Sequence, residues 1–571
     1  MRPVEYRDMT MAEYLSPGVY VEEFDSAGQP LSGVSTSTAG FIGMAERGPV
    51  EGLPVLVTSM NEFKRTFGGY LSENQFGAHR YLAYAADQFF MNGGSRAYIM
   101  RVAPSDAAVA ASSGYFFEIS AKNPGAWANE IRIHGEPSSK AKTQIYEDLG
   151  EGKYRVKNSS GFHEGDTVVF THGASRIMSK VVHARDRMIE LDHPLGGDVV
   201  DNSLLPLKTL ATVEFNLHVV YGEETETFEH CSFNPSAANY VDNAASRSAL
   251  VHIRAVQDAE VTELLGEEST FSISLAGGSD GSSGGISPDQ YIGEDRGPGK
   301  RTGIQAFVDN DQVSIMAVPG VTDPNVQLAL VAHCENLGSR FAILDIPREK
   351  TKVPDVLTHR DMFDSSYAAM YNPWLQVFDP LEKRNIFIPP SGSVAGIYAR
   401  SDSTRGVEKA PANEVVRGVT GLEVQYNKGE QDVLNPKGVN LIRSFSGQGI
   451  RIWGARTTSS NALWKYINIR RLFIFVEESI KAGTNWVVFE PNDERLWARV
   501  QRTIDAFLTR VWRGGALMGS SPSEAFYIDI SRNTMTQDDI DNGRLICVVG
   551  IAPVKPAEFV IFRITQKTNE Q

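Results

Sequence analysis

Four short stretches of the chain contain residue types that could take part in catalysis or ligand binding. The first, GGSDG at 277–281, matches the GxSxG pattern of serine hydrolases, whose serine occupies a tight turn between a strand and a helix. An apolar stretch, FSISLA, precedes it, but the SSGGISP that follows is not typical of a helix start. We interpret GGSDG as a flexible glycine joint. A hydrolase that uses Ser279 is kept as the alternative.

The second stretch, RGPGKRTG at 296–303, invites comparison with a phosphate-binding loop. The Walker pattern requires an earlier glycine and a Ser or Thr directly after the lysine, whereas Glu294 and Arg301 occupy those two positions here. We therefore expect Lys300 and Arg301 to bind acidic neighbours within a loop.

The remaining two stretches pair reactive side chains within predicted helices. His333 and Cys334 lie on the same stripe as apolar residues of DPNVQLALVAHCENLG, which predicts a place in the core. Asp538 and Asp539 follow Thr536 and are typical of a helix N-cap with acidic first-turn residues. With these readings no acid–base or metal-binding arrangement remains, so we predict no enzyme activity, no cofactor and no metal.

One charged pattern, unlike these four stretches, keeps a functional interpretation beside the structural one. In NDERLWARVQRTIDAFLTRVWRGG, at 492–515, apolar residues recur at helical spacing and define one face. The opposite face carries a row of arginines: Arg495, Arg499, Arg502, Arg510 and Arg513. Two interpretations stay open. The row is a solvated face paired with local acids such as Asp493, or it docks an acidic protein partner, since arginine binds carboxylates through two hydrogen bonds.

The elements around these stretches begin with a strand that has no local partner. YLSPGVYVEEFD, at 14–25, alternates in the manner of a β-strand over Val19, Tyr20, Val21, Glu22, Glu23 and Phe24. A lone strand is unstable in water, yet the next fifteen residues are small and polar and predict a linker. About thirteen extended residues reach about 40 Å. The strand therefore has the reach to pair on another molecule.

The rest of the chain predicts an α/β and α+β multidomain protein. Strands alternate with capped helices in 39–113 and again from 276 onward, as in VSIMAVPG, DPNVQLALVAHCENLG and RFAILDIP, which indicates parallel βαβ units. Between them, 114–275 is rich in short alternating strands and reads as an inserted antiparallel β module. The C-terminal stretch RLICVVGIAPVKPAEFVIFRITQ predicts two strands separated by prolines.

The composition limits the function classes. The 571 residues carry a net charge of −15, which argues against nucleic-acid binding and against anionic membranes. Three cysteines, distant in sequence, favour neither a disulfide framework nor a zinc site. The N-terminal MRPVEYRDMTMAEYL has no apolar core and predicts no secretory signal, and no apolar run is long enough for membrane insertion.

Together these stretches resemble the contractile tail sheath proteins of bacteriophages and of phage-derived injection systems. The resemblance rests on an ordered set that spans nearly the whole chain; only the insert at about 140–235 lacks a close match. The set comprises SPGVYVEE, GFIGMAERGP, LVTSMNEFKRTFGG, FFMNGGSRAYIMRV, NPGAWANEIRI, LAGGSDG, YIGEDRGPGKRTG, GVNLIRSFSGQGIRIWGARTT, YINIRRLFIFVEESI, FEPNDERLWARVQRTIDAFL and NTMTQDDIDNGRLICVVGIAPVKPAEFVIFRI.

The resemblance implies a structural subunit of a sheath that stacks as rings around an inner tube and contracts to drive the tube through an envelope. It implies that both chain ends donate strands to neighbouring subunits. The N-terminal strand would be Val19–Phe24. The C-terminal strand would comprise Phe559, Val560, Ile561, Phe562, Arg563 and Ile564. The arginine helix would then dock the tube in the extended state and release it on contraction.

The resemblance also implies a domain plan, partners and a location. The plan is an arm and linker at 1–38, an inner tube-facing α/β domain from 39–113 and 438–571, an outer β domain at 114–275 and a middle domain at 276–437. The partners are other copies, the tube protein, and baseplate and cap proteins, in a phage tail or injection particle assembled in the bacterial cytoplasm. A non-contractile shell protein that polymerises through the same arms is the second alternative. Phage or injection system, ring symmetry and target stay open.

Overall fold

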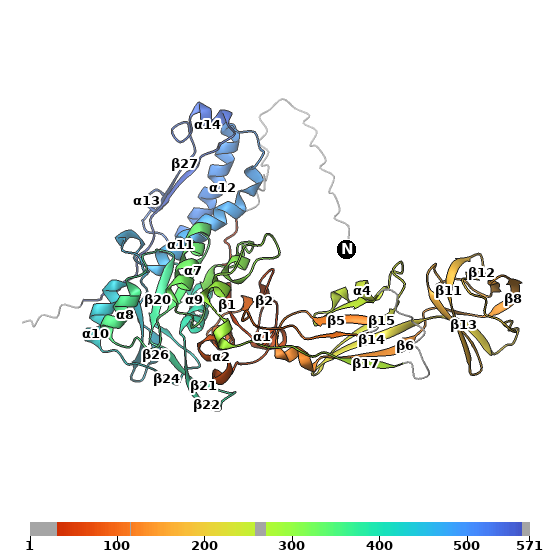
Figure 1. The fold of residues 1–571 in the computed structure, drawn as a ribbon. Helices are drawn as coiled ribbons and strands as arrows, with labels where there is room; N and C mark the ends of the chain where they lie inside the picture. The colour runs from red at the N-terminus through yellow and green to blue at the C-terminus, as the bar shows by residue number, and fades with distance from the viewer. Residues whose placement is uncertain (1–30, 115, 257–269, 562–571) are drawn as a thin grey trace, which may run out of the picture. The chain divides into compact units, whose positions relative to one another are not determined.

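A computed structural model describes residues 31–114, 116–256 and 270–561 (Figure 1). These residues divide into two compact units, 34–478 with 553–561, and 31–33 with 479–552. Within the described residues, no helix combines the length and the apolar character that a membrane span requires.

The larger unit is built on a nine-stranded sheet. Its inner neighbours, from β3 through β1, β18, β19 and β20 to β25, pair in parallel, while β2, β26 and β23 add antiparallel edges. In spatial order the strands are β2 (Val55–Val57), β3 (Ala97–Val102), β1 (Ala39–Met44), β18 (Ile315–Ala317), β19 (Phe341–Asp345), β20 (Ala368–Asn372), β25 (Val439–Phe445), β26 (Gly449–Ile452) and β23 (Glu414–Val415).

Helices cover both faces of this sheet, because successive residues of its strands belong to two different cores. Ile343 of β19 packs in the same cluster as Val394, whereas the next residue, Leu344, packs in the cluster of Leu330. The first face carries α1 (Met60–Phe67), α3 (Leu82–Met91) and α9 (Ser391–Arg405). The second face carries α7 (Pro324–Leu337), α8 (Val353–Arg360) and α10 (Lys428–Leu434).

Local signals explain where these helices begin and end. The Asp323 side chain accepts a hydrogen bond from the Asn325 amide and caps α7, Pro324 occupies its first turn, and Gly338 ends it in the left-handed conformation with φ of 67°. The predicted bounds of this helix are therefore confirmed.

Two antiparallel β modules interrupt the α/β part. One contains a four-stranded and a three-stranded sheet that share one apolar cluster; the other contains a seven-stranded sheet with a core of its own. The first has β15 (Glu224–Cys231), β14 (Glu214–Tyr221), β6 (Arg132–Ser138) and β17 (Phe271–Ser274), with β16 (Val251–Ala255), β5 (Phe117–Ala121) and β4 (Ala111–Ser113). The second has β7 (Lys142–Thr143), β13 (Lys208–Thr212), β10 (Thr167–His172), β11 (Ser175–Arg185), β12 (Met188–Leu191), β9 (Lys153–Val156) and β8 (Ile145–Gly150).

Shorter elements complete the larger unit. They are α2 (Glu73–Phe76), α4 (Val241–Ala244), α6 (Pro288–Ile292) and the small sheet of β22 (Arg384–Ile388), β21 (Leu375–Asp379) and β24 (Gly421–Leu422). Helix α11 (Ile467–Gly483) begins in this unit and runs into the smaller one, which holds α12 (Glu494–Arg513), α13 (Pro522–Ala525), β27 (Phe526–Asp529), α14 (Gln537–Asp541) and β28 (Val548–Ile551).

The predicted fold class, a mixed α/β multidomain protein with parallel units and separate antiparallel β-sheets, is confirmed. The predicted domain plan places 39–113 with the C-terminal segment, 438–571. In the structure, β1 of that segment hydrogen-bonds to β18, so 39–102 forms one sheet with the middle segment, and β25 lies within the same sheet.

Candidate assembly surfaces

The GxSxG stretch has no catalytic geometry. The backbone of Ser279 pairs with Ala108, and its hydroxyl accepts a hydrogen bond from the Gly281 amide at 3.1 Å. Asp280 is also used structurally, because it accepts hydrogen bonds from the Ala126 amide and from Gln75. The stretch is thus a joint that ties the β module to the α/β part of the same unit.

The basic loop and the His–Cys pair are also structural. Arg301 pairs with Asp295 at 2.8 Å and with Asp309, as predicted, whereas Lys300 forms no ion pair with a described residue. His333 and Cys334 are buried. Burial, together with the nearby Arg340 charge, lowers the pKa of His333 to about 4, while burial raises the pKa of Cys334 to about 12. Both side chains are therefore neutral members of the core.

The acid pair caps a helix. Thr536 and Asp539 form a reciprocal capping box at the start of α14, which confirms the predicted cap. No cluster of His, Cys, Asp and Glu in the described part of the chain has the arrangement of a metal site.

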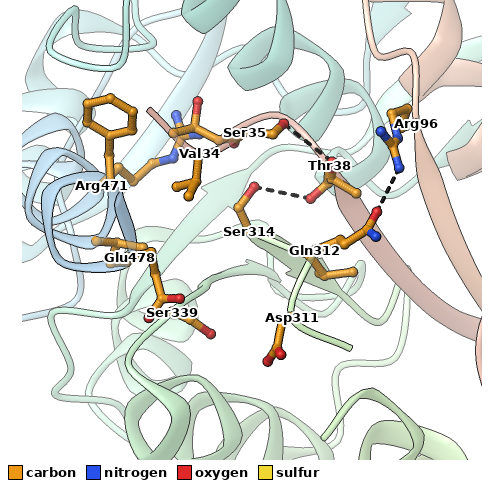
Figure 2. A pocket seen from close by; sticks show the side chains of 14 residues that line it. Val34, Ser35, Thr38, Arg96, Asp311, Gln312, Ser314, Ser339, Arg471 and Glu478 are labelled. Atoms are coloured by element: carbon orange, nitrogen blue, oxygen red, sulfur yellow. Dashed lines mark hydrogen bonds between the residues drawn. The ribbon is translucent and has the colours of Figure 1, made fainter. Parts of the chain in front are cut away.

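The N-terminal segment enters the larger unit beside a hollow of about 400 Å³ (Figure 2). Residues 34–36 and Thr38 line it, as do Arg96, Gln312 and Ser314. The Thr38 carbonyl accepts hydrogen bonds from the Ser314 hydroxyl at 3.2 Å and from the Ser314 and Ile315 amides. Thr38 therefore leads directly into the central strand β1.

A buried ion pair holds this segment from the other side. Arg471 of α11 binds Asp402 of α9 through two hydrogen bonds of 2.9 and 2.6 Å, and both side chains are about 5% exposed or less. Thr36 completes the group: its hydroxyl donates to Asp402 at 2.6 Å, and its carbonyl accepts from Arg471 at 2.8 Å. The pair thus fixes the segment through which the chain enters the larger unit.

The C-terminal segment has a matching anchor at Glu558. Its carboxylate accepts two hydrogen bonds from Arg456, at 2.8 and 2.7 Å, and one each from Asn435 and Tyr466 at 2.8 and 2.9 Å. Partial burial acts to raise the pKa of Glu558, but these hydrogen bonds outweigh it and lower the pKa to about 2. Glu558 is therefore ionised at neutral pH.

The sequence did not single out the residues of these two anchors, which are Thr36, Asp402, Arg471, Arg456 and Glu558. A usable signal was present in YINIRRLFIFV, where two arginines interrupt an otherwise apolar helix. A buried arginine requires a partner, but the sequence does not tell which distant carboxylate supplies it.

Beyond Glu558 the chain leaves the fold. Phe559, Val560 and Ile561 are in no strand and are 72, 68 and 80% exposed. The rest of the predicted C-terminal strand, 562–564, and the whole predicted N-terminal strand, 19–24, lie outside the described residues.

The smaller unit presents an incomplete sheet. β27 and β28 form an antiparallel pair and, among the described residues, neither strand has a second partner. Tyr527 at its centre is 60% exposed. Two-stranded sheets are marginally stable, and their open edges are templates for further strands.

The arginine row lies on an exposed face of α12. The apolar face is buried, and all five arginines are exposed. Arg499 pairs with Glu490 at 3.1 Å and lies 4.1 Å from the centre of the Trp486 ring, while Arg510 donates to the Leu31 carbonyl. Within the described residues, Arg495, Arg502 and Arg513 form no ion pair, so most of this positive charge is left to solvent.

Comparisons with known proteins match the C-terminal half of the chain to two domains of one family. Residues 284–458 match the phage tail sheath protein central domain, and residues 459–567 match the phage tail sheath C-terminal domain. A putative prophage major tail sheath protein of Pseudomonas aeruginosa is 27% identical over 48% of this chain and 71% of its own length. The tail sheath protein of Escherichia phage P2 is 26% identical over 47% of this chain and 69% of its own length.

The fold also matches a solved structure, the sheath complex of an extracellular contractile injection system, PVC, in its contracted state. That match has a TM-score of 0.53 and 21% identity, and it covers 98% of this chain and 99% of the other.

Proposed function

Because the chain belongs to the phage tail sheath protein family, we propose that its two ends join neighbouring subunits by adding strands to their β27–β28 sheets. The chain is a contractile tail sheath subunit of the kind found in phage tails and contractile injection systems, and is a structural protein, not an enzyme.

The observation that carries the proposal is the open β27–β28 sheet of the smaller unit, in a chain whose two ends have sequences that predict strands. The smaller unit offers a two-stranded sheet, and the chain continues past Glu558 as exposed apolar residues. Residues 19–24 have the residue types of a strand, and residues 559–564 are an almost continuous apolar run of strand-forming residues. Each added strand would supply several backbone hydrogen bonds of about 1 kcal/mol net, repeated at every joint of the assembly.

The arginine row is the proposed contact with the inner tube. Three of its members have no partner within the described residues, which favours an acidic partner over a face neutralised by Asp493, Glu494 and Asp505. Charge contacts at a rim hold moderately and depend on geometry. We propose that the row docks the tube in the extended state and releases it on contraction. We place the smaller unit innermost and the β modules outward, with baseplate and cap proteins at the ends of the sheath.

The test is electron microscopy of the full-length chain, mixed with tube protein, beside a variant lacking residues 1–25. Sheathed tubes from the full-length chain and bare tubes from the truncated chain are the expected result. Equal sheathing by both would contradict strand exchange through the N-terminal arm. Sheaths that form but never shorten when triggered would favour a non-contractile shell.

A further inference from the structure

The loop that joins α11 to α12, residues 484–493, presents apolar side chains to solvent (Figure 1). Phe489 is 102% exposed, and Val488 beside it is 62% exposed. Of the described aromatic side chains, none is more exposed than Phe489. Adjacent exposed apolar side chains on a soluble unit are typical of a contact surface for another molecule.

The backbone at Phe489 is strained. Its φ is 69°, in the left-handed region that bulky side chains rarely adopt. The Glu490 amide donates to the Val487 carbonyl at 3.1 Å, and the Val487 amide donates to the Thr484 carbonyl at 2.9 Å, so the turn is closed by hydrogen bonds. A fully exposed ring gains no packing energy that offsets this strain within the subunit. Strain of this kind is concentrated at binding and switch sites, which indicates a gain on contact with a partner.

Arg499 of α12 holds this turn from both sides. Its guanidinium pairs with Glu490, directly after Phe489, at 3.1 Å, and lies 4.1 Å from the centre of the Trp486 ring, three residues before Phe489. The planar guanidinium can stack on a ring and bind a carboxylate at the same time. One side chain therefore fixes the two ends of the turn while the apolar tip faces solvent.

The turn adjoins the unpaired part of the arginine row. Arg495, Arg499 and Arg502 are four and three residues apart, so they lie along one face of α12. The charge of Arg499 is balanced by Glu490, whereas Arg495 and Arg502 form no ion pair with a described residue. An apolar tip thus lies beside two positive charges that have no counter-charge, and protein interfaces combine an aromatic centre with a polar rim in this way.

We propose that Phe489 is the apolar anchor of the contact with the inner tube, where it enters an apolar pocket bordered by carboxylates. This rests on the proposed docking of the arginine row, because the unpaired Arg495 and Arg502 are what call for the acidic border. Arg499 is a positioning residue that presents the ring. A contact held by charge alone weakens steeply with salt, whereas a buried phenyl group keeps its contribution as salt rises.

The experiment measures the concentration of full-length chain that gives half-maximal co-sedimentation with tubes, at low and at high salt. Phe489→Asn removes the ring and introduces a residue that accepts the left-handed conformation. It should raise this concentration about tenfold or more at both salt concentrations. Arg495→Gln with Arg502→Gln should raise it mainly at low salt. Leu204→Ala, at an equally exposed position in the seven-stranded module, is the control and should leave it unchanged.

Urea unfolding of the unassembled chain separates loss of binding from loss of folding. Phe489→Asn should raise the unfolding midpoint, because it relieves the left-handed strain and removes no packing. A variant that binds tubes less well although it is more stable fits an anchor. A lowered midpoint would show that the ring packs within the subunit, and would overturn the proposal.

The positioning role of Arg499 has its own readout, taken at high salt, where the charge of Glu490 is screened. Arg499→Gln should weaken co-sedimentation in the wild-type chain but add little to Phe489→Asn, because it acts through the ring. Effects that multiply in the double variant would make Arg499 a direct contact and would overturn this role.

The anchor and the proposed tube contact fail in different ways. If Phe489→Asn co-sediments like wild type while the Arg495 and Arg502 variant is weakened, the anchor is wrong and the arginine contact stands. If neither variant is weakened, the arginine contact with the tube is itself wrong. If Phe489→Asn reduces self-association without tubes and leaves tube binding intact, the loop joins copies of the chain, which would also overturn the anchor.

Discussion

Buried charges with defined partners are the residues that this fold depends on. Arg471–Asp402 and Arg456–Glu558 are bidentate pairs that join segments distant in sequence. Asp345 is a third case, with different partners. Its carboxylate lies at the end of β19 and accepts hydrogen bonds from the Gly320 amide and from the amide and hydroxyl of Ser391, at the start of α9.

Asp345 gives the stability of the chain a defined pH dependence. Burial raises the pKa of Asp345 to about 6, against the lowering effect of its hydrogen bonds. The folded state then binds the proton more tightly than the unfolded state, so this residue's contribution falls as pH rises from about 4 to about 6 and is constant above. Asp345→Asn should lack this component, which urea unfolding at pH 4 to 7 would measure.

The size of this pH dependence can be predicted, and Asp364→Asn is its control. The difference between wild type and Asp345→Asn should change by about 2 to 3 kcal/mol across that range. Asp364→Asn, at an exposed site where hydrogen bonds from Ser460 lower the pKa, should show no fall over the same interval. A pH-independent difference for Asp345→Asn would contradict the assignment.

The arginine row predicts an acidic partner surface, which charge reversal tests. Arg499→Glu with Arg502→Glu places negative charge at the centre of the proposed contact and should weaken sheath assembly on tubes about tenfold or more, with the largest effect at low salt. A matched double reversal, Arg532→Glu with Arg296→Glu, changes the net charge equally on other exposed surfaces. Equal loss in both variants, measured by co-sedimentation with tubes, would show that only net charge matters.

Helices α3 and α9 pack closely at two glycines of α9. A Cβ on Gly392 would lie 2.5 Å from Ala85 backbone atoms, and one on Gly396 would lie 2.5 Å from the Phe89 carbonyl oxygen. The two glycines are one helix turn apart and let the helix backbones approach closely. Gly396→Ala should therefore lower the free energy of unfolding by about 1 to 3 kcal/mol, despite alanine's higher helix propensity.

Ser403→Ala, on an exposed position of the same helix, is the matched control for this substitution and should change stability little. A stabilised Gly396→Ala variant in a urea titration would show that the helices can separate without cost.

Sequence patterns predicted elements well where local chemistry decides them. Asp323, Pro324 and Gly338 mark both ends of α7, and Ala97–Val102 is β3 as predicted. Pairing between distant segments was not predictable in the same way. Nothing in the alternation of 39–44 specifies β18 as its partner, and nothing local to Glu558 specifies Arg456, because such choices depend on the whole core.

The seven-stranded β module is joined to the rest of the chain by two connections that lie close together. The seven-stranded module has its own apolar core, and its entry and exit lie together: Thr212 and Ala141 exchange hydrogen bonds, and Ser138 pairs with Glu214 in the adjoining sheet. Closely spaced ends of this kind permit excision of a domain.

Replacing residues 139–213 by Asn-Gly should join β6 and β14 as a hairpin, since this dipeptide favours the required turn. We expect the shortened chain to fold and to form sheaths on tubes, because the module faces outward in the proposed arrangement. Circular dichroism and electron microscopy test the two parts separately. A folded chain that forms no sheath would place the module within the assembly contacts.

In the proposed assembly, the β27–β28 sheet of each subunit is completed by strands from its neighbours. A helical reconstruction of sheaths assembled on tubes measures this directly. Four strands are expected in that sheet, with residues 19–24 of one neighbour and 559–564 of another beside the subunit's own pair. A sheet that remains two-stranded in the assembled sheath, with the arms bound elsewhere, would contradict it.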